Sequence, residues 1–127
     1  CYNIALKYSK EREQFGKPIA GKQLIQKKLV DMITEITKSQ LICYRLGKIM
    51  DSGKIDYRQI SMAKRNNVKI ASDIAKEARQ ILGGMGITSD FSIMRHMINL
   101  ETLITYQGTN EMHLLITGRD ITGIDAF

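Results

Sequence analysis

The 127-residue sequence has no tryptophan, one proline and two cysteines. Cys1 and Cys43 do not form a CxxC pair and only two histidines are present, which argues against a disulfide framework or a structural zinc site. The low cysteine content favours a reducing compartment. No apolar run approaches the roughly 18 residues of a membrane-spanning helix, so we expect no membrane segment. Because Pro18 is the only proline, the rest of the chain is free to form long helices.

The charge of the chain is positive and unevenly distributed. The formal net charge is +6, with 18 Lys/Arg and 9 Asp/Glu in residues 1–100 but 1 and 4 in residues 101–127. A basic surface of this kind suits an anionic partner such as a phosphorylated cofactor, coenzyme A, nucleic acid or a membrane. Scattered solubilising lysines would give the same composition. Hydrophobic residues at 43% and charged residues at 25% are typical of a globular domain.

The length is that of a single domain. Its first residue is cysteine rather than methionine, and no charged and then apolar leader follows. We therefore expect the chain to be part of a larger protein.

Apolar residues recur at three- and four-residue spacing along most of the chain. This spacing predicts helices over residues 1–14, 22–50, 56–82 and about 89–103, with a last helix that starts near Thr109. Alternating strand patterns do not persist for more than a few residues, so we predict no strand. Long helices joined by short loops indicate an all-α fold, an up-down antiparallel helical bundle.

Several residues predict how these helices begin, end and pack. Asp56 and Thr109 are expected to cap the helices that follow them, and Ser89 or Asp90 the helix between. The glycine-rich segment 83–86 ends a helix, and without a preceding strand it is a C-cap rather than a dinucleotide fingerprint. Asn67 lies in an apolar stripe, where an interhelical hydrogen bond is expected. His113 is expected to lie at the surface or to cap a helix.

Two segments have the chemistry to contact a ligand. Residues 12–16 place a guanidinium and an aromatic ring beside a bend, where they could bind a phosphate and stack on an adenine. The Gly108-Thr109 pair opens a helix, whose free amides favour anions and hydrogen-bond acceptors. The sequence offers no recognisable Ser/His/Asp or Cys/His nucleophile pair.

Four motifs occur in one order and register. They are Arg-x-Gln-Phe-Gly-x-Pro at 12–18, Gln-Leu-Ile-Gln-Lys-Lys-Leu at 23–29, Gln-Ile-Leu-Gly-Gly-Met-Gly-Ile at 80–87 and Tyr-Gln-Gly-Thr at 106–109. Together they resemble the C-terminal helical domain of the acyl-CoA dehydrogenases over essentially the whole chain. Within that family the resemblance is greatest to the glutaryl-CoA dehydrogenases, through residues 23–32, 64–67, 93–96, 99–101 and 118–127.

The resemblance implies that residues 1–127 form the C-terminal bundle of a larger flavoprotein, whose N-terminal helical and middle β domains lie outside this chain. It implies FAD as cofactor, an acyl-CoA substrate and an electron-transfer flavoprotein as electron acceptor. It further implies a homotetramer, built as a dimer of dimers, that binds neither nucleic acid nor membrane. The compartment would be the cytoplasm in a bacterium or the mitochondrial matrix in a eukaryote.

The resemblance also assigns residue roles, with no metal ligand among them. Arg12 would lie near the FAD pyrophosphate and Phe15 near its adenine end. Gln23 would contact FAD from the following helix. The FAD of a neighbouring subunit would be reached by Gln80, Gly83 and Gly84. The flavin would be approached by Thr109, and the thioester site would be lined by Tyr106 and Gly108. The C-terminal Phe127 would lie near the cofactor.

One position departs from the family pattern. The family commonly has a catalytic Glu in Tyr-Glu-Gly-Thr, where this chain has Gln107. An amide has no useful basicity near neutral pH and cannot remove the α-proton of an acyl thioester. Four explanations stay open: a base from an upstream helix, substitution by Glu111, a protein that binds without dehydrogenating, or a deliberate Glu→Gln change.

Two other functions are therefore considered. A non-catalytic acyl-CoA and FAD-binding homologue would bind both ligands without flavin reduction. A basic helical module for nucleic acid would show steeply salt-dependent DNA binding. The second is disfavoured because the basic residues are spread along the helices without interleaved aromatic residues.

Overall fold

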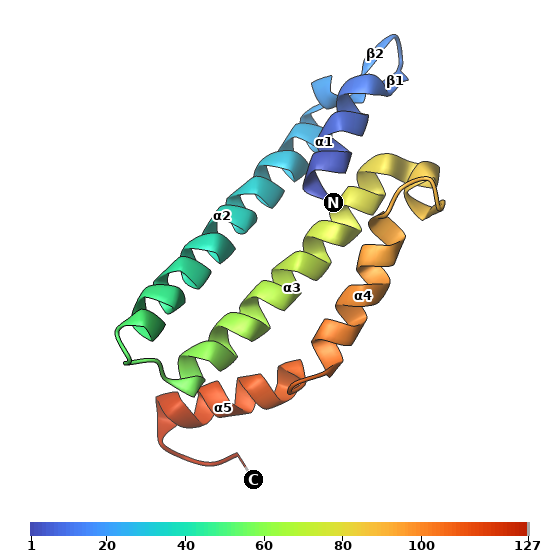
Figure 1. Ribbon diagram of the computed structural model, residues 1–127. Helices are drawn as coiled ribbons and strands as arrows, with labels where there is room; N and C mark the ends of the chain where they lie inside the picture. Colours follow the sequence, from blue (N-terminus) through green and yellow to red (C-terminus); the bar gives the residue numbers. More distant parts are fainter. Residues whose placement is uncertain (127) are drawn as a thin grey trace.

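The computed structural model describes residues 1–126, and most of them lie in five α-helices (Figure 1). The α-helices are α1 (Tyr2–Glu11), α2 (Gln23–Asp51), α3 (Tyr57–Leu82), α4 (Ile93–Thr105) and α5 (Asn110–Thr122). The shorter elements are strands β1 (Glu13–Gln14) and β2 (Lys17–Pro18) and the 3-10 helices η1 (Ile19–Gly21) and η2 (Gly83–Ile87). The expected all-α helical bundle is confirmed.

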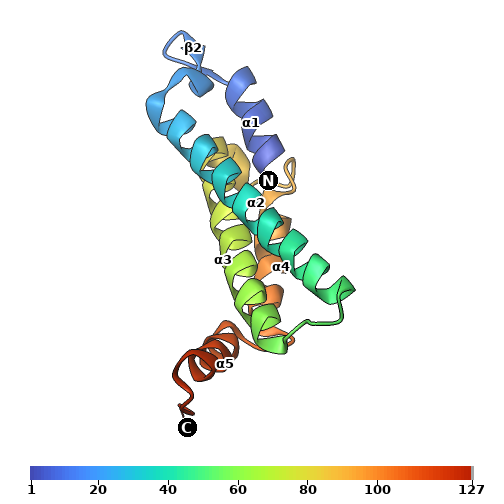
Figure 2. The same cartoon turned by 90° about the vertical axis from the view of Figure 1, so that its left-hand side faces the viewer.

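Helix α3 lies at the centre of this arrangement. It contacts α1, α2, α4 and α5, and α2, α3 and α4 run alternately up and down beside one another (Figures 1 and 2). Helix α5 departs from the up-down pattern because it crosses the end of α3 (Figure 1). Since α3 spans 26 residues, it carries side chains from one end of the molecule to the other.

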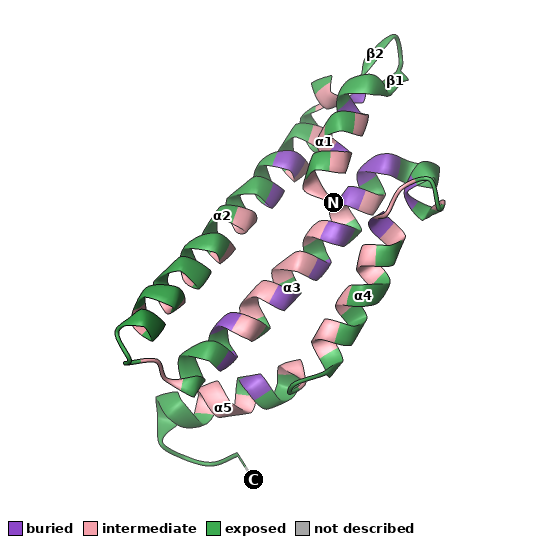
Figure 3. Cartoon of the chain, in the orientation of Figure 1, coloured by how far each residue is buried: buried purple, intermediate pink, exposed green. Residues whose placement is uncertain are grey.

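The main core lies where α1, α2, α3 and α4 meet, and burial decreases along α2 away from it (Figure 3). Its buried members are Ala5, Ile19, Leu29, Met32, Ala78, Ile81, Leu82 and Ile93. Along α3 the buried face consists largely of small side chains, which allow neighbouring helices to approach closely. These include Ser61, Ala63, Ser72, Ala75 and Ala78.

The first predicted helix ends earlier than expected and the prediction of no strand is wrong. Helix α1 stops at Glu11, and β1 and β2 pair as a small antiparallel hairpin. Phe15 and Gly16 form its two-residue loop, with φ of 56° and 74°. Two consecutive positive φ angles match the right-handed twist of a hairpin, so the chain reverses direction here and cannot continue the helix.

The expected caps of the fourth helix are also wrong. Helix α4 starts at Ile93, after Ser92, and ends at Thr105. The reason is that η2 and the turn after it bring Phe91 back to α1, where its ring packs edge-on against Tyr8 at 5.7 Å between centroids. A helix that began at residue 89 or 90 would include Phe91, and the turn that brings its ring to Tyr8 could not form.

Other local predictions are confirmed. The Asp56 carboxylate caps α3 by accepting from the Arg58 backbone N–H at 2.9 Å. Gly83 ends α3 with a φ of 59°, a conformation that favours glycine. The Asn67 amide donates to Cys43 Sγ at 3.1 Å, which joins α3 to α2. Among residues 1–126, no helix combines the length and the apolar character needed to cross a membrane.

Candidate functional site

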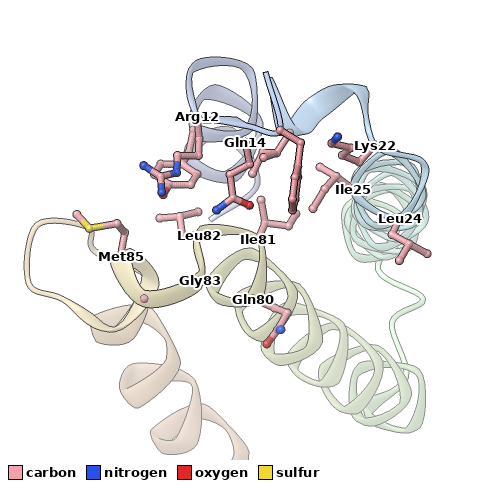
Figure 4. Close-up of a pocket in the computed structure, with 14 residues that line it drawn as sticks. Arg12, Gln14, Lys22, Leu24, Ile25, Gln80, Ile81, Leu82, Gly83 and Met85 are labelled. Atoms are coloured by element: carbon pink, nitrogen blue, oxygen red, sulfur yellow. The ribbon is translucent and has the colours of Figure 1, made fainter. Parts of the chain in front are cut away.

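A pocket of about 660 Å³ lies between the hairpin, the start of α2 and the junction of α3 with η2 (Figure 4). This volume falls within the roughly 300–1,000 Å³ typical of small-molecule sites. The pocket brings together five of the residues assigned to the cofactor, namely Arg12, Phe15, Gln80, Gly83 and Gly84. The hairpin and the end of α3 therefore contribute to one surface, although Phe15 and Gln80 are 65 residues apart in sequence.

The hairpin supplies an exposed aromatic ring and positive charge. Phe15 is 91% exposed, and the Lys22 ammonium lies 5.2 Å from its ring centroid. In Figure 4, Arg12 and Gln14 lie on the hairpin side of the pocket, across from Lys22 and Ile25. Arg12 and Lys22 thus offer two cations to phosphate oxygens, and the exposed Phe15 ring offers a face to a flat base.

The α3–η2 junction supplies an open backbone edge. A Cβ added at Gly83 or at Gly84 would meet nothing within 4 Å. Groups outside this chain can therefore approach the backbone of both glycines closely. Together, the cations, the aromatic ring and the open glycine edge fit a phosphorylated nucleotide cofactor such as FAD.

One assigned residue, Gln23, lies outside this pocket. Gln23 is exposed at the first position of α2 and does not line this pocket, whereas Lys22 and Leu24 on either side of it do. Phe127 lies outside the described residues. The sequence analysis did not single out Lys22, whose position one residue before Gln23 at the start of a helix was the available signal.

The second group of assigned residues forms the turn between α4 and α5. Gln107 and Gly108 both have positive φ, 53° and 92°. The Thr109 hydroxyl accepts from the Met112 N–H at 3.3 Å, which confirms Thr109 as the N-cap of α5. The exposed Tyr106 and Gln107 side chains thus sit at the joint where the chain turns from α4 into α5.

Lys64, from the first half of α3, contacts this turn. Its ammonium donates to the carbonyl oxygens of Tyr106 at 2.8 Å and Gly108 at 2.5 Å. It also lies 5.9 Å from the Tyr106 ring centroid. The sequence analysis noted Lys64 only as part of a family-like segment, because its partners lie 42 and 44 residues away.

The expectation for His113 is wrong, because its side chain is buried. Its exposed fraction is 9%, and neither ring nitrogen has a hydrogen-bond partner within residues 1–126. A Cβ added at Gly108 would lie 2.9 Å from His113 Nε2. The imidazole therefore packs directly against the turn, as its position four residues after Thr109 on the first turn of α5 permits.

Acid-base chemistry at the turn is limited. Hydrogen bonds from the Glu111 backbone N–H and from Thr109 lower the pKa of Glu111. A carboxylate with a lowered pKa is a weaker base, and this position near the start of α5 also favours the ionised form. The part of the chain that the structure describes has no group of three or more His, Cys, Asp or Glu side chains able to hold a metal ion.

The two groups lie far apart. Lys64 beside the turn and Gln80 at the pocket are 16 residues apart on α3, which corresponds to about 24 Å along the helix axis. The structure therefore separates the assigned residues into a hairpin pocket and an α4–α5 turn.

Comparison with known proteins agrees with this arrangement. Residues 1–122 match the family model "Acyl-CoA dehydrogenase, C-terminal domain". The chain belongs to the acyl-CoA dehydrogenase family. This confirms the resemblance drawn from the four motifs, and it places both the hairpin pocket and the α4–α5 turn within the domain that matches.

Solved structures and curated members of the family are similar over nearly the whole chain. A glutaryl-CoA dehydrogenase from Mycobacterium smegmatis is 48% identical, with a TM-score of 0.98, over 100% of this chain and 33% of that one. A second structure of glutaryl-CoA dehydrogenase from that organism, in complex with FADH2, is 45% identical with a TM-score of 0.97 over 99% of this chain and 33% of that one. The short-chain-specific acyl-CoA dehydrogenase of Megasphaera elsdenii is 37% identical over 90% of this chain and 30% of its own length.

A further member is part of a complex. It is a subunit of the caffeyl-CoA reductase–Etf complex of Acetobacterium woodii, 34% identical over 88% of this chain and 30% of its own length. The chain thus spans about a third of the length of the relatives it matches.

Proposed function

We propose that this chain is the C-terminal domain of a larger FAD-dependent acyl-CoA dehydrogenase that acts on glutaryl-CoA. The reaction is α,β-oxidation of the thioester, with or without decarboxylation to crotonyl-CoA, and the electrons pass to an electron-transfer flavoprotein. The observation that carries the proposal is the clustering of the motif residues into two preformed surfaces, in a chain 48% identical to a glutaryl-CoA dehydrogenase.

The hairpin pocket is the proposed cofactor surface of the domain. Arg12 and Lys22 bind the FAD pyrophosphate, Phe15 contacts the adenine end, and the Gly83–Gly84 backbone approaches the cofactor closely. When bound, FAD accepts the hydride that leaves the β-carbon of the substrate. The pocket and the turn lie about 24 Å apart along α3, and the family resemblance assigns Gln80, Gly83 and Gly84 to the FAD of a neighbouring subunit. The pocket then serves the FAD of a neighbouring subunit, and Thr109 the flavin of its own.

The α4–α5 turn is the proposed thioester surface. Tyr106 and Gly108 line it, and the backbone N–H of Gln107 donates to the thioester oxygen. Such a hydrogen bond stabilises the charge that develops on this oxygen when the α-proton leaves, and so lowers the pKa of that proton. The Gln107 side chain cannot take the proton, and the lowered pKa of Glu111 makes that carboxylate a poor substitute. The base is then a carboxylate of the N-terminal part of the protein.

The Gln107 side chain also supports a second candidate function. A homologue that binds FAD and acyl-CoA without dehydrogenation would retain every group named above except the base. The two candidates share both surfaces and differ only in whether the flavin is reduced.

The exposed apolar residues of α2 support an oligomeric state in which this helix is covered. The residues concerned are Leu24, Val30, Ile33, Leu41, Tyr44 and Met50, and apolar surface of this kind usually marks an interface. We propose that neighbouring domains and subunits of a homotetramer cover it. The Etf-associated relative supports the electron acceptor. Bacterial and mitochondrial relatives support the bacterial cytoplasm or the mitochondrial matrix as the compartment.

The test uses the full-length protein, purified with its flavin. Glutaryl-CoA is added without oxygen and the flavin absorbance is followed, with butyryl-CoA as the matched control substrate. Fast bleaching by glutaryl-CoA supports the proposed dehydrogenase and a base outside position 107. A shifted flavin spectrum without bleaching supports the non-catalytic candidate. Faster bleaching by butyryl-CoA contradicts the substrate assignment, and a protein that purifies without flavin and takes up none contradicts both candidates.

A further inference from the structure

Lys64, eight residues into α3, makes two contacts with the α4–α5 turn. Its ammonium donates to two carbonyl oxygens that flank Gln107, at 2.8 Å to Tyr106 and 2.5 Å to Gly108. Two carbonyl dipoles that point at one place repel each other unless a cation lies between them. Hydrogen bonds to a charged donor are about twice as strong as neutral ones. The ammonium therefore fixes the distance between the two ends of the turn.

The turn needs such support because its backbone is intrinsically unfavourable. Gln107 carries a side chain at a φ of 53°, a region that residues with a Cβ rarely adopt. Strained residues of this kind persist only where the surrounding structure holds them. On one side of the turn is Lys64, and on the other the buried imidazole of His113 packs against Gly108.

We infer that Lys64 is a positioning residue that holds the α4–α5 turn in the conformation that presents Gln107 to the acyl thioester. Its link to the substrate rests on the function proposed above, whereas its hold on the turn rests on the two hydrogen bonds of the Lys64 ammonium. Lys64 does not touch the substrate in this account. It acts through the backbone of residues 106–108, so it is needed whether position 107 holds a glutamine or a glutamate.

A simpler role is that Lys64 only caps the end of α4, since Tyr106 is the C-cap residue of that helix. Such a cap would protect the end of the helix without any effect on ligand binding. The two roles are separated by measuring the turn and the ligand independently, in the full-length flavoprotein.

The variants are Lys64→Met, which keeps the length of the side chain without the charge, and Lys64→Arg, which restores a cation. Lys69→Met is the matched control, because Lys69 lies on α3 in an exposed pair with Asp73 at 2.6 Å. Amide hydrogen exchange over residues 104–111 reports on the turn. The change of the flavin spectrum on titration with glutaryl-CoA reports on the ligand, and thermal unfolding shows whether each variant is folded.

We expect Lys64→Met to raise exchange at residues 106–109 and to weaken glutaryl-CoA binding, each by about tenfold or more. Lys64→Arg should change the exchange rate and the glutaryl-CoA affinity less than Lys64→Met does, and Lys69→Met should leave both at the wild-type value. Unchanged amide hydrogen exchange over residues 106–109 in Lys64→Met shows that Lys64 does not hold the turn, and it overturns the inference. Raised exchange with unchanged glutaryl-CoA affinity overturns the positioning role and leaves Lys64 as a helix cap.

A failure of the proposed function gives a different experimental result from a failure of the positioning role. In that case no acyl-CoA changes the flavin spectrum of the wild-type protein, while hydrogen exchange still decides whether Lys64 holds the turn. If Lys64→Met does not fold, Lys64→Gln, which removes the charge and keeps a polar side chain, takes its place. An exchange rate over residues 106–109 and a glutaryl-CoA affinity that both equal the wild-type values in a folded Lys64→Gln variant overturn the inference.

Discussion

Two turns of this molecule share a pair of positive φ angles and are held in different ways. Phe15-Gly16 and Gln107-Gly108 each pair a non-glycine residue with a glycine, with φ of 56° and 74° in the first and 53° and 92° in the second. The first turn closes a hairpin whose paired residues, Glu13 with Pro18 and Gln14 with Lys17, lie within five positions of each other in sequence. The second is held by Lys64 and His113 from other helices.

The hairpin turn and the α4–α5 turn therefore differ in the contacts that hold their conformations. A Cβ at Gly16 would meet nothing within 4 Å, whereas one at Gly108 would lie 2.9 Å from the buried His113 ring. The loop of the hairpin is therefore free of tertiary packing at Gly16, and the strand pairs on either side of it set its shape. The α4–α5 turn depends on tertiary contacts, so changes in α3 or α5 are transmitted to it.

The largest expected effect comes from the side chain that the second turn presents. Gln107→Glu places a carboxylate at the position where the family commonly has its base. If the wild-type protein binds glutaryl-CoA without reducing its flavin, as the non-catalytic candidate requires, we expect this variant to raise the rate of flavin reduction by about 10² to 10⁴-fold, the usual contribution of a positioned general base. Stopped-flow absorbance of the flavin measures it, with Gln107→Asn as the control. In that protein an unchanged rate would show that position 107 does not face the α-carbon, whereas a wild type that already reduces its flavin and gains little from Gln107→Glu supports a base outside position 107.

The next effect compares the two glycines. Gly16→Ala should lower the free energy of unfolding by about 1–2 kcal/mol, the cost of a left-handed conformation for alanine. Gly108→Ala should cost about 3 kcal/mol or more, because overpacking against His113 is added to that conformational cost. Urea unfolding of the two variants measures the difference.

A double variant sharpens this comparison. His113→Ala removes the ring that a Cβ at Gly108 would meet, so Gly108→Ala should be less destabilising in that background than in the wild type. Equal costs at Gly16 and Gly108 would mean that the backbone conformation alone, without the packing, decides both turns.

A smaller effect on stability is expected at the hairpin. Phe15→Asn removes the exposed ring and introduces a residue that tolerates positive φ, so unfolding should change by no more than about 0.5 kcal/mol. The FAD content after purification should nevertheless fall, because the proposed adenine contact is lost. Flavin-to-protein absorbance ratios measure this, and Ile98→Asn at an exposed position of α4 is a control for surface polarity. Full FAD content in Phe15→Asn would remove Phe15 from the cofactor site.

The smallest effect concerns the ion pairs that join α3 to α5 beyond the second turn. Arg58 donates to the carboxylates of Asp56 and Asp120, and its side-chain and backbone hydrogen bonds to Asp56 lower the pKa of Asp56 from 3.8 to about 2. A carboxylate with a lowered pKa stabilises the fold fully above its unfolded pKa, and this contribution is lost as the pH falls through the folded pKa. The window therefore runs from about pH 4 down to about pH 2.

Asp56→Asn removes this contribution. Its urea midpoint should lie slightly below that of the wild type at pH 5, and the difference should disappear by pH 2. Asp73→Asn, in an exposed pair within α3, is the control. A difference between wild type and Asp56→Asn that stays constant from pH 5 to pH 2 would show that the cap acts through its geometry rather than its charge.

The sequence was sufficient for the features that local physics controls. The long α2, the Asp56 and Thr109 caps and the glycine end of α3 each follow from residues within a few positions of one another. An interhelical hydrogen bond of Asn67 was also expected, because a polar residue in an apolar stripe needs a partner, and the structure identifies Cys43 as that partner.

The features that the sequence analysis missed depend on distant contacts or on the backbone of one turn. The hairpin was missed because Phe15 adopts a conformation that glycine or asparagine would have signalled. The start of α4 was wrong because Phe91 packs against Tyr8, 83 residues earlier. Lys64 and the burial of His113 could not be inferred from spacing, since both depend on how α3 and α5 cross.

The central place of α3 has a consequence for the order in which this domain is made. The hairpin side of the pocket ends at Ile25, and its other side begins at Gln80, which is 55 residues later in the chain. At about 5–20 residues per second, a ribosome needs roughly 3–11 s to make the segment between them. Helix α2 is complete at Asp51, whereas α3, against which both α1 and α2 pack, is complete only at Leu82. Within this domain the apolar faces of α1 and α2 therefore stay exposed until α3 is made, and they are the surfaces that a chaperone would meet in that state.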